Sequence, residues 1–233
     1  MRYFNTLKNA ITHTLERMNT VTTDMGLKVN ETKTKIMVFE REEQVTECKV
    51  TINGAELEQV NEFVYLGRTF ARDGGLDNEI KKRVNAGRSI LGCMRDVVKR
   101  ECISKEAKVA IYKTVLVPTL LYGSESWVCQ KKHLSKVNAV GVDFLRNVCG
   151  KSRRDRVRNN WVLNECGIKE DIKLRYDKGI LRWFGHVERM NDDRLTKQIY
   201  EAEEEGMRGR GRPRKVWKDA INATLKNRNI RST

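Results

Sequence analysis

The sequence lacks any long hydrophobic run, and this absence excludes functions that need a membrane-spanning helix. No stretch of about 18 consecutive apolar residues occurs, the length that a helix needs to cross a bilayer. The first residues enter helical periodicity directly, without the uninterrupted apolar core of a signal peptide. We therefore expect an intracellular protein, nuclear or cytoplasmic, with no membrane partner.

Metal-binding patterns are also absent. The cysteines are widely and irregularly spaced, no Cys-x-x-Cys occurs, and the chain has only three histidines. A structural zinc site needs close pairs of such ligands, so we expect no metal site. Six cysteines in an intracellular protein are expected to be free and mostly buried thiols. They are Cys48, Cys93, Cys102, Cys129, Cys149 and Cys166.

Positive charge is abundant. Lys and Arg number 46 against 31 Asp and Glu, which gives a net charge of +15. With 233 residues and 39% hydrophobic side chains, the chain can bury the core of one large domain or two small ones, so its charge lies on folded faces. The excess predicts a polyanionic partner, nucleic acid first and an acidic membrane second.

The first segment reads as a helix, a polar turn and a strand. Apolar residues recur three or four apart from Phe4 to Met25 and predict one helical stripe that ends at Gly26. A turn carrying Lys33 follows, and residues 34–40 alternate like a short strand. On the residues alone, Lys33 is a cation in a solvated turn. Further on, Asn53-Gly54 predicts a tight hairpin.

Helical periodicity dominates from Asp77, a plausible N-cap. A second helix is expected from Ser104, with a kink or break near Val117 because Pro118 lacks a backbone donor. A third is expected to end near Gly150. His186, later in the chain, has apolar neighbours and no metal-spaced partner, which favours a packed residue. Asp192-Asp193 reads as a capping turn rather than a metal site.

Two basic stretches are candidate nucleic-acid contacts. In residues 151–158, five cations occupy eight positions, a density typical either of a solvated loop or of phosphate binding. In residues 208–215, alternating arginines, glycines and Pro213 look like an AT-hook core, while the alternative is a basic linker whose proline opens the final helix. Gly-Arg repeats also bind RNA. The candidate contacts are Arg153, Arg154, Arg156, Arg158, Arg208, Arg210, Arg212, Arg214 and Lys215.

Four strings resemble, in chain order, parts of the reverse transcriptases of non-LTR retrotransposons. Gly26–Phe39 resembles the segment after the catalytic palm turn, and Glu62–Gly67, ending Tyr-Leu-Gly, resembles the primer grip. Ala110–Trp127 resembles the thumb, and Leu181–Met190 resembles a string of the carboxy-terminal region. The resemblance covers nearly the whole chain, but only the last part of a longer enzyme.

The resemblance implies an α+β fold in three parts. Residues 1–72 would be a partial palm with a small antiparallel sheet, residues 73–150 a helical thumb, and residues 151–233 a basic helical region. The partner would be an RNA/DNA duplex or DNA. The intact enzyme uses Mg²⁺ held by aspartates that precede this chain, so we expect no cofactor here and no complete catalytic site.

Carried over residue by residue, the resemblance gives few catalytic candidates. Lys33 matches the palm-turn lysine that acts as general acid toward the pyrophosphate leaving group, and Tyr65, Leu66 and Gly67 match the primer grip. Three hypotheses remain open. In the first, the chain is a truncated or domesticated fragment that binds nucleic acid. In the second, it is the carboxy-terminal half of an enzyme, and a longer reading frame or a separate amino-terminal polymerase chain supplies the rest. In the third, it is a scaffold whose charge only aids solvation.

Overall fold

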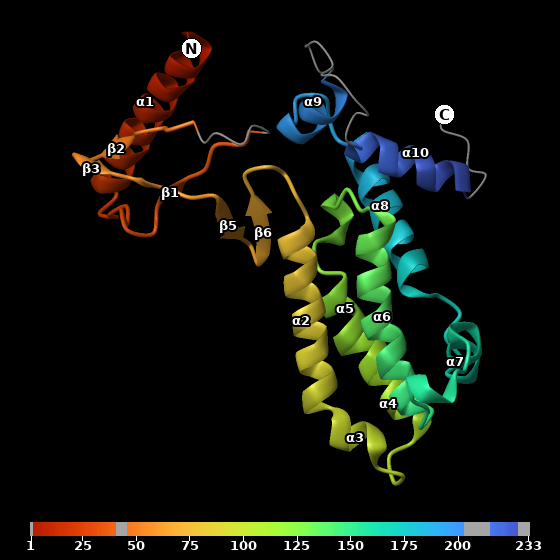
Figure 1. The fold of residues 1–233 in the computed structure, drawn as a ribbon. Helices are drawn as coiled ribbons and strands as arrows, with labels where there is room; N and C mark the ends of the chain where they lie inside the picture. The colour runs from red at the N-terminus through yellow and green to blue at the C-terminus, as the bar shows by residue number, and fades with distance from the viewer. Residues whose placement is uncertain (1, 41–45, 203–214, 228–233) are drawn as a thin grey trace. The chain divides into compact units, whose positions relative to one another are not determined.

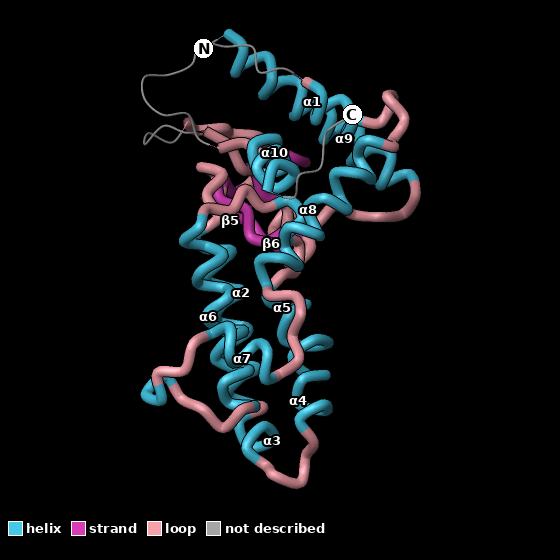
Figure 2. The backbone as a smooth tube through the Cα atoms, turned by 90° about the vertical axis from the view of Figure 1, so that its right-hand side faces the viewer, coloured by secondary structure: helices cyan, strands magenta, loops and turns pink. Residues whose placement is uncertain are grey.

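The computed structural model describes residues 2–40, 46–202 and 215–227, which form two compact units, Met1–Glu79 and Ile80–Thr233 (Figure 1). The described strands all belong to unit 1, and unit 2 is built from helices (Figure 2). This mainly helical composition with small strand pairs agrees with the expected α+β class. The division into palm, thumb and carboxy-terminal region stays a prediction.

Helix α1 (Arg2–Asp24) ends where the sequence predicts, at a glycine in the left-handed region. Gly26 has φ +76°, and its N–H donates to the Thr23 carbonyl at 2.9 Å. The Leu27 N–H reaches back to the Thr22 carbonyl at 2.8 Å. These two bonds form a Schellman motif, which satisfies carbonyls left open at the helix end.

Three two-stranded ladders follow α1. They pair β1 (Lys35–Ile36) with β4 (Glu58–Gln59), β2 (Thr51–Ile52) with β3 (Ala55–Glu56), and β5 (Glu62–Tyr65) with β6 (Arg68–Ala71). The first pair is parallel and the other two are antiparallel. The prediction of a small antiparallel sheet is therefore wrong for the β1–β4 pair, which is parallel. The expected strand over residues 34–40 forms ladder pairs only at Lys35 and Ile36, which lie opposite Glu58 and Gln59 of β4.

Unit 1 has a small core beneath β2 and β3. Its buried residues are Cys48, Val50, Ile52 and Leu57, against which Leu15, Val29, Ile36 and Val38 pack. Most of the α1 stripe predicted to pack is exposed instead, including Ile11, Met18 and Val21. Periodicity identified the apolar face of α1, but this core is too small to cover it.

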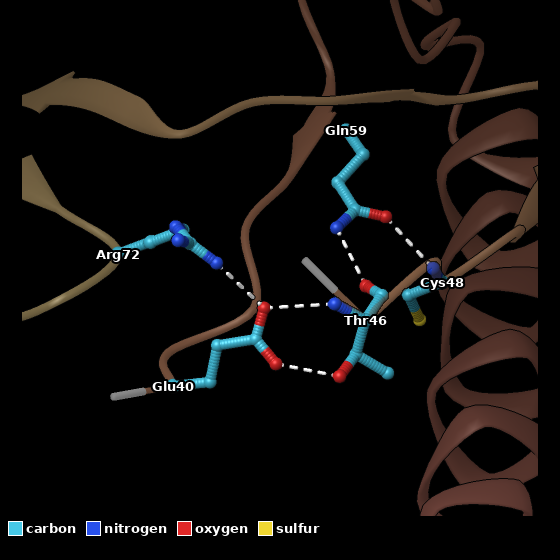
Figure 3. Close-up of polar contacts among 5 residues, drawn as sticks. All are labelled: Glu40, Thr46, Cys48, Gln59 and Arg72. Atoms are coloured by element: carbon cyan, nitrogen blue, oxygen red, sulfur yellow. Dashed lines mark hydrogen bonds and ion pairs between the residues drawn. The ribbon is translucent and has the colours of Figure 1, made fainter. Parts of the chain in front are cut away.

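A carboxylate joins the chain on both sides of residues 41–45 (Figure 3). Glu40 accepts hydrogen bonds from the Thr46 amide at 2.8 Å, from the Thr46 hydroxyl at 2.5 Å and from Arg72 at 2.9 Å. Gln59 extends the network, because its amide donates to the Thr46 carbonyl and accepts from the Cys48 amide. These bonds, led by the Thr46 hydroxyl, lower the pKa of Glu40.

Unit 2 is a bundle whose helices are short except for three. Its elements are α2 (Asp77–Cys93), which begins in unit 1, α3 (Arg95–Lys99), α4 (Lys105–Ile111), η1 (Tyr112–Leu116), α5 (Val117–Leu120), η2 (Ser124–Ser126), α6 (Lys131–Val148), η3 (Arg153–Asp155), α7 (Asn159–Glu165), α8 (Ile172–Glu188), α9 (Leu195–Glu201) and α10 (Trp217–Asn227). Helices α3, α4, α7 and α8 all pack against α6 (Figure 1).

The helix expected from Ser104 is interrupted as predicted, in an unexpected form. Ser104 caps α4 by accepting from the Ala107 amide at 3.2 Å. The chain then widens into the π-helical turn η1 before Pro118, which lies in the first turn of α5. A π-helical turn shifts the hydrogen-bond register, which accommodates a residue that cannot donate.

Two glycines allow close packing in unit 2. A Cβ on Gly87 of α2 would lie 2.6 Å from a methyl of Leu120, and one on Gly141 of α6 would lie 2.4 Å from the Cδ1 of Ile172 on α8. The lack of a side chain at Gly141 therefore sets how closely α8 approaches α6. Helix α8 is also held by Tyr176, whose hydroxyl donates to the Trp127 carbonyl at 3.0 Å.

All six cysteines are free, as the sequence predicts, but they are not mostly buried. Only Cys48 and Cys166 are buried, while Cys93 and Cys102 are exposed. The sulfurs of Cys149 and Cys166 lie 3.3 Å apart. Burial, followed by the contact with Cys149, raises the pKa of Cys166 to about 12.

Candidate nucleic-acid interface

The basic segment 151–158 forms an exposed loop between α6 and α7 (Figure 2). Gly150 follows α6 with φ +62°, which turns the chain out of the helix as predicted. Ser152 and Asp155 then cap η3 reciprocally. The Asp155 carboxylate accepts from the Ser152 amide at 2.6 Å, and the Ser152 hydroxyl accepts from the Arg154 amide at 3.2 Å. The bonds from Ser152 lower the pKa of Asp155.

Two arginines anchor this loop to the bundle. Arg146, buried on α6, donates to the Val157 carbonyl at 2.6 Å and to the Asn159 side chain at 2.7 Å. Arg153 forms a bidentate ion pair with Asp143 of α6, with its Nε 3.0 Å from Oδ1. A charge that is paired within the protein is less available to a phosphate, so Arg153 is the weakest contact candidate in the loop.

Three arginines of the loop remain accessible. Arg154, Arg156 and Arg158 are exposed and form no ion pair with any residue that the structure describes. Arg156 adopts φ +53°, a left-handed conformation that is uncommon for a residue with a side chain, and its amide donates to the Arg153 carbonyl. The three guanidinium groups therefore belong to one short exposed loop, and guanidinium groups match the geometry of phosphate oxygens.

The other predicted contacts lie elsewhere. Arg208, Arg210, Arg212 and Arg214 fall outside the described residues, so the hook prediction is not tested by the structure. Lys215 is exposed just before α10. The structure therefore brings together four of the nine predicted cations, in one loop.

The catalytic and primer-grip candidates belong to unit 1. Lys33 is exposed in a turn built by Asn30, whose side chain accepts from the Lys33 amide at 3.0 Å and from the Thr32 hydroxyl at 2.7 Å. Within residues 2–40, 46–202 and 215–227, the Lys33 amine makes no ion pair. Asn30 is thus the residue that organises the turn, a role that the sequence reasoning did not assign.

Tyr65, Leu66 and Gly67 form the tip of the β5–β6 hairpin. Tyr65 pairs with Arg68, and the two residues between them have φ +48° and +78°, as in a two-residue primed turn. Tyr65 and Leu66 are 59% and 75% exposed, which is unusual for large apolar side chains.

Nothing in the described part of the chain resembles a metal centre. No group of three or more His, Cys, Asp or Glu side chains has the geometry to hold an ion there. Asp192 and Asp193 lie exposed in a turn before α9, in which the Arg194 amide donates to the Asn191 carbonyl at 3.0 Å. Among the described helices, none is both long and apolar enough to cross a bilayer.

Sequence reasoning missed an aromatic cluster on α8, α9 and α10. Phe184 and Trp217 both contact Tyr200, and their ring centroids lie 6.0 and 5.8 Å from the centroid of the Tyr200 ring. Trp183 and His186 form a separate ring pair. The prediction of a packed His186 is wrong, because the residue is exposed near the end of α8. The spacing of three residues between Trp183 and His186 could have indicated the ring pair, since residues three apart share a helix face.

Comparison with known proteins finds relatives among mobile-element proteins. The chain is 25% identical over 200 residues to a transposon-derived protein of Caenorhabditis elegans, an alignment that covers 83% of this chain and 70% of the relative. It is 28% identical over 127 residues to the RNA-directed DNA polymerase from the mobile element jockey of Drosophila melanogaster, and 29% identical over 122 residues to that of Drosophila funebris.

The polymerase alignments are partial on both sides. They cover 54% and 52% of this chain but only 13% of each polymerase. No family model matches the chain, and no solved structure matches it. The chain is therefore related, over part of its length, to transposon-derived and mobile-element polymerase sequences.

Proposed function

We propose that this chain binds nucleic acid through the loop between α6 and α7, as part of a retrotransposon reverse transcriptase or as a protein derived from one. The observation that carries the proposal is the exposure of Arg154, Arg156 and Arg158 on a loop anchored by Arg146. The net charge of +15 adds long-range attraction for a polyanion. Two relatives are named RNA-directed DNA polymerases, which makes RNA and DNA the expected partners.

The same proposal assigns roles to residues outside the loop. Lys33 is the general-acid candidate, the Tyr65–Gly67 tip contacts a primer strand, and residues 208–215 add a minor-groove or RNA contact. The chain is the carboxy-terminal part of such an enzyme and does not polymerise by itself. Mg²⁺ would be held by aspartates of the other part of the polymerase, as the resemblance implies.

Replacing the three accessible arginines by glutamine tests the loop. Each phosphate contact contributes about 0.9 to the slope of log affinity against log salt on duplex DNA. The triple variant of Arg154, Arg156 and Arg158 should therefore lower that slope by up to about 3 units and weaken binding at low salt. Fluorescence anisotropy with a labelled duplex, measured over a salt series, gives both quantities.

A matched control separates local contacts from net charge. Lys99, Lys113 and Lys131 are exposed cations of unit 2 outside the loop, and their replacement by glutamine removes the same total charge. This control should keep most of the wild-type slope. Equal losses in the two triple variants would show that charge acts only globally and would overturn the assignment to the loop.

A second candidate function follows from the exposed hairpin tip. Val64, Tyr65 and Leu66 are more than half exposed on a two-stranded ladder, and such surfaces and strand edges favour association. We propose that an amino-terminal polymerase segment covers them and completes an active enzyme. Co-expression with the upstream palm segment of a related polymerase tests this. Lack of co-purification, or retained co-purification after Leu66→Asp, would count against it.

A further inference from the structure

The last two turns of α8 carry a pair of rings that are both partly open to solvent. Trp183 is 38% exposed and His186 is also exposed. Their ring centroids are 5.2 Å apart with planes at 47°, so each ring steadies the other. More than half of the Trp183 side chain is covered within the fold, and the remainder leaves part of the indole open to a partner.

The neighbouring aromatic residues provide a contrast. Phe184, next in sequence, contacts Tyr200 of α9, and Tyr200 contacts Trp217 of α10. The indole N–H of Trp217 donates to the Glu125 carbonyl at 2.8 Å. These three rings fasten α9 and α10 to the rest of unit 2. Trp183 and His186 instead contact each other, and both are exposed.

Cations flank the exposed pair. Arg182 and Arg189 are exposed and lie four and three residues from His186, so all three share one face of α8. Gly185 makes room for one of them, because a Cβ there would lie 3.1 Å from the Nη1 of Arg189. The guanidinium of Arg189 therefore lies back along the helix, over Gly185. The carboxylate of Glu188, on the same helix end, lies 4.0 Å from the Lys197 amine.

We propose that Trp183 and His186 form a stacking platform for an unpaired base of a single-stranded nucleic acid, with Arg182 and Arg189 binding the adjoining phosphates. This inference rests on the proposed nucleic-acid binding and adds a second, single-strand site to it. Aromatic rings stack on any base, because every base has a π face, and neighbouring guanidinium groups neutralise the backbone. The flanking positive charge favours a nucleic acid over a protein partner for this surface.

Trp183→Ala tests the platform with two probes, a single-stranded dT 20-mer and an abasic 20-mer with the same phosphodiester backbone. Loss of one base stack should weaken binding of the dT 20-mer by roughly 5- to 100-fold. Binding of the abasic 20-mer should change less than about twofold. Trp183→Phe keeps a ring and should retain most of the affinity. Far-UV circular dichroism confirms that each variant is folded.

A control and the contradicting results complete the test. Ile199→Ala removes another exposed apolar side chain, 66% exposed on α9, without removing a ring, and should leave both affinities unchanged. If the wild-type chain binds both probes and Trp183→Ala binds them equally well, the platform is wrong while the proposed function stands. If the wild-type chain binds neither probe nor a duplex, the proposed function itself fails. Equal weakening of both probes by Trp183→Ala would also overturn base stacking.

Discussion

At the scale of single residues, polar side chains fix the loops of unit 1. Asn30 builds the turn that carries Lys33, and Asn53 joins that turn to α1, since it contacts Glu31 at 3.2 Å and Asn19 at 2.7 Å. Glu40 holds the chain on both sides of residues 41–45. With so small a core, these bonds contribute a large share of the order in unit 1.

The bonds to Glu40 predict an acid-sensitive unit 1. The folded pKa of Glu40 lies below its usual value of 4.5, so its contribution to stability is present above that pH and disappears as the pH falls through the folded pKa. Glu40→Gln should therefore destabilise unit 1 at pH 7 and have a smaller effect at an acidic pH below 4.5. Hydrogen exchange of unit 1 peptides, compared with wild type at each pH, measures this. A loss of protection that is the same at both pH values would contradict it.

At the scale of elements, the bundle depends on how closely its helices approach. Helix α8 lies against α6 at Gly141, and the turn before Trp127 holds α8 through Tyr176. The aromatic contacts of Tyr200 then join α9 and α10 to α8. The position of the exposed ring pair therefore depends on the packing of a buried glycine.

Gly141→Ala tests this packing. Its Cβ would lie 2.4 Å from the Cδ1 of Ile172, which is buried and has little room to move. Overpacking of this kind typically costs about 1–3 kcal/mol, more than the roughly 0.5–1 kcal/mol that alanine gains in helix propensity. We expect a lower unfolding midpoint by thermal circular dichroism. Gly92→Ala in α2 has no atom within 4 Å of the new Cβ and should raise the midpoint slightly. A midpoint that rises in both variants would show that the α6–α8 contact is loose.

At the scale of the whole molecule, local signals were predictable and distant pairings were not. The helix end at Gly26 and the tight turn at Asn53-Gly54, with φ +51° and +79°, follow from backbone chemistry that lies within a few residues. The parallel pairing of β1 with β4 depends on residues more than twenty positions apart, which no local pattern specifies. The exposure of the α1 stripe likewise reflects the small size of the core.

For the candidate site, too, the sequence predicted the local features but not the contacts between distant residues. The density of cations in residues 151–158 identified the loop, but only the fold shows that Asp143 pairs with Arg153 and that Arg146 anchors the loop. The pairing depends on a turn of α6 ten residues away, so charge counting overstated the number of free contacts. His186 was predicted to be packed because its neighbours are apolar, and that local pattern does not show which face of α8 stays exposed.

The salt dependence of binding to an RNA–DNA hybrid tests the central claim most directly. The full chain would be titrated with a labelled 20-base-pair hybrid from 50 to 500 mM KCl. If the accessible arginines neutralise about three phosphates, log affinity should fall linearly with log salt, by a factor of roughly 10² to 10³ over this range. Affinity as high at 500 mM as at 50 mM would contradict phosphate binding and leave the positive charge as an aid to solvation alone.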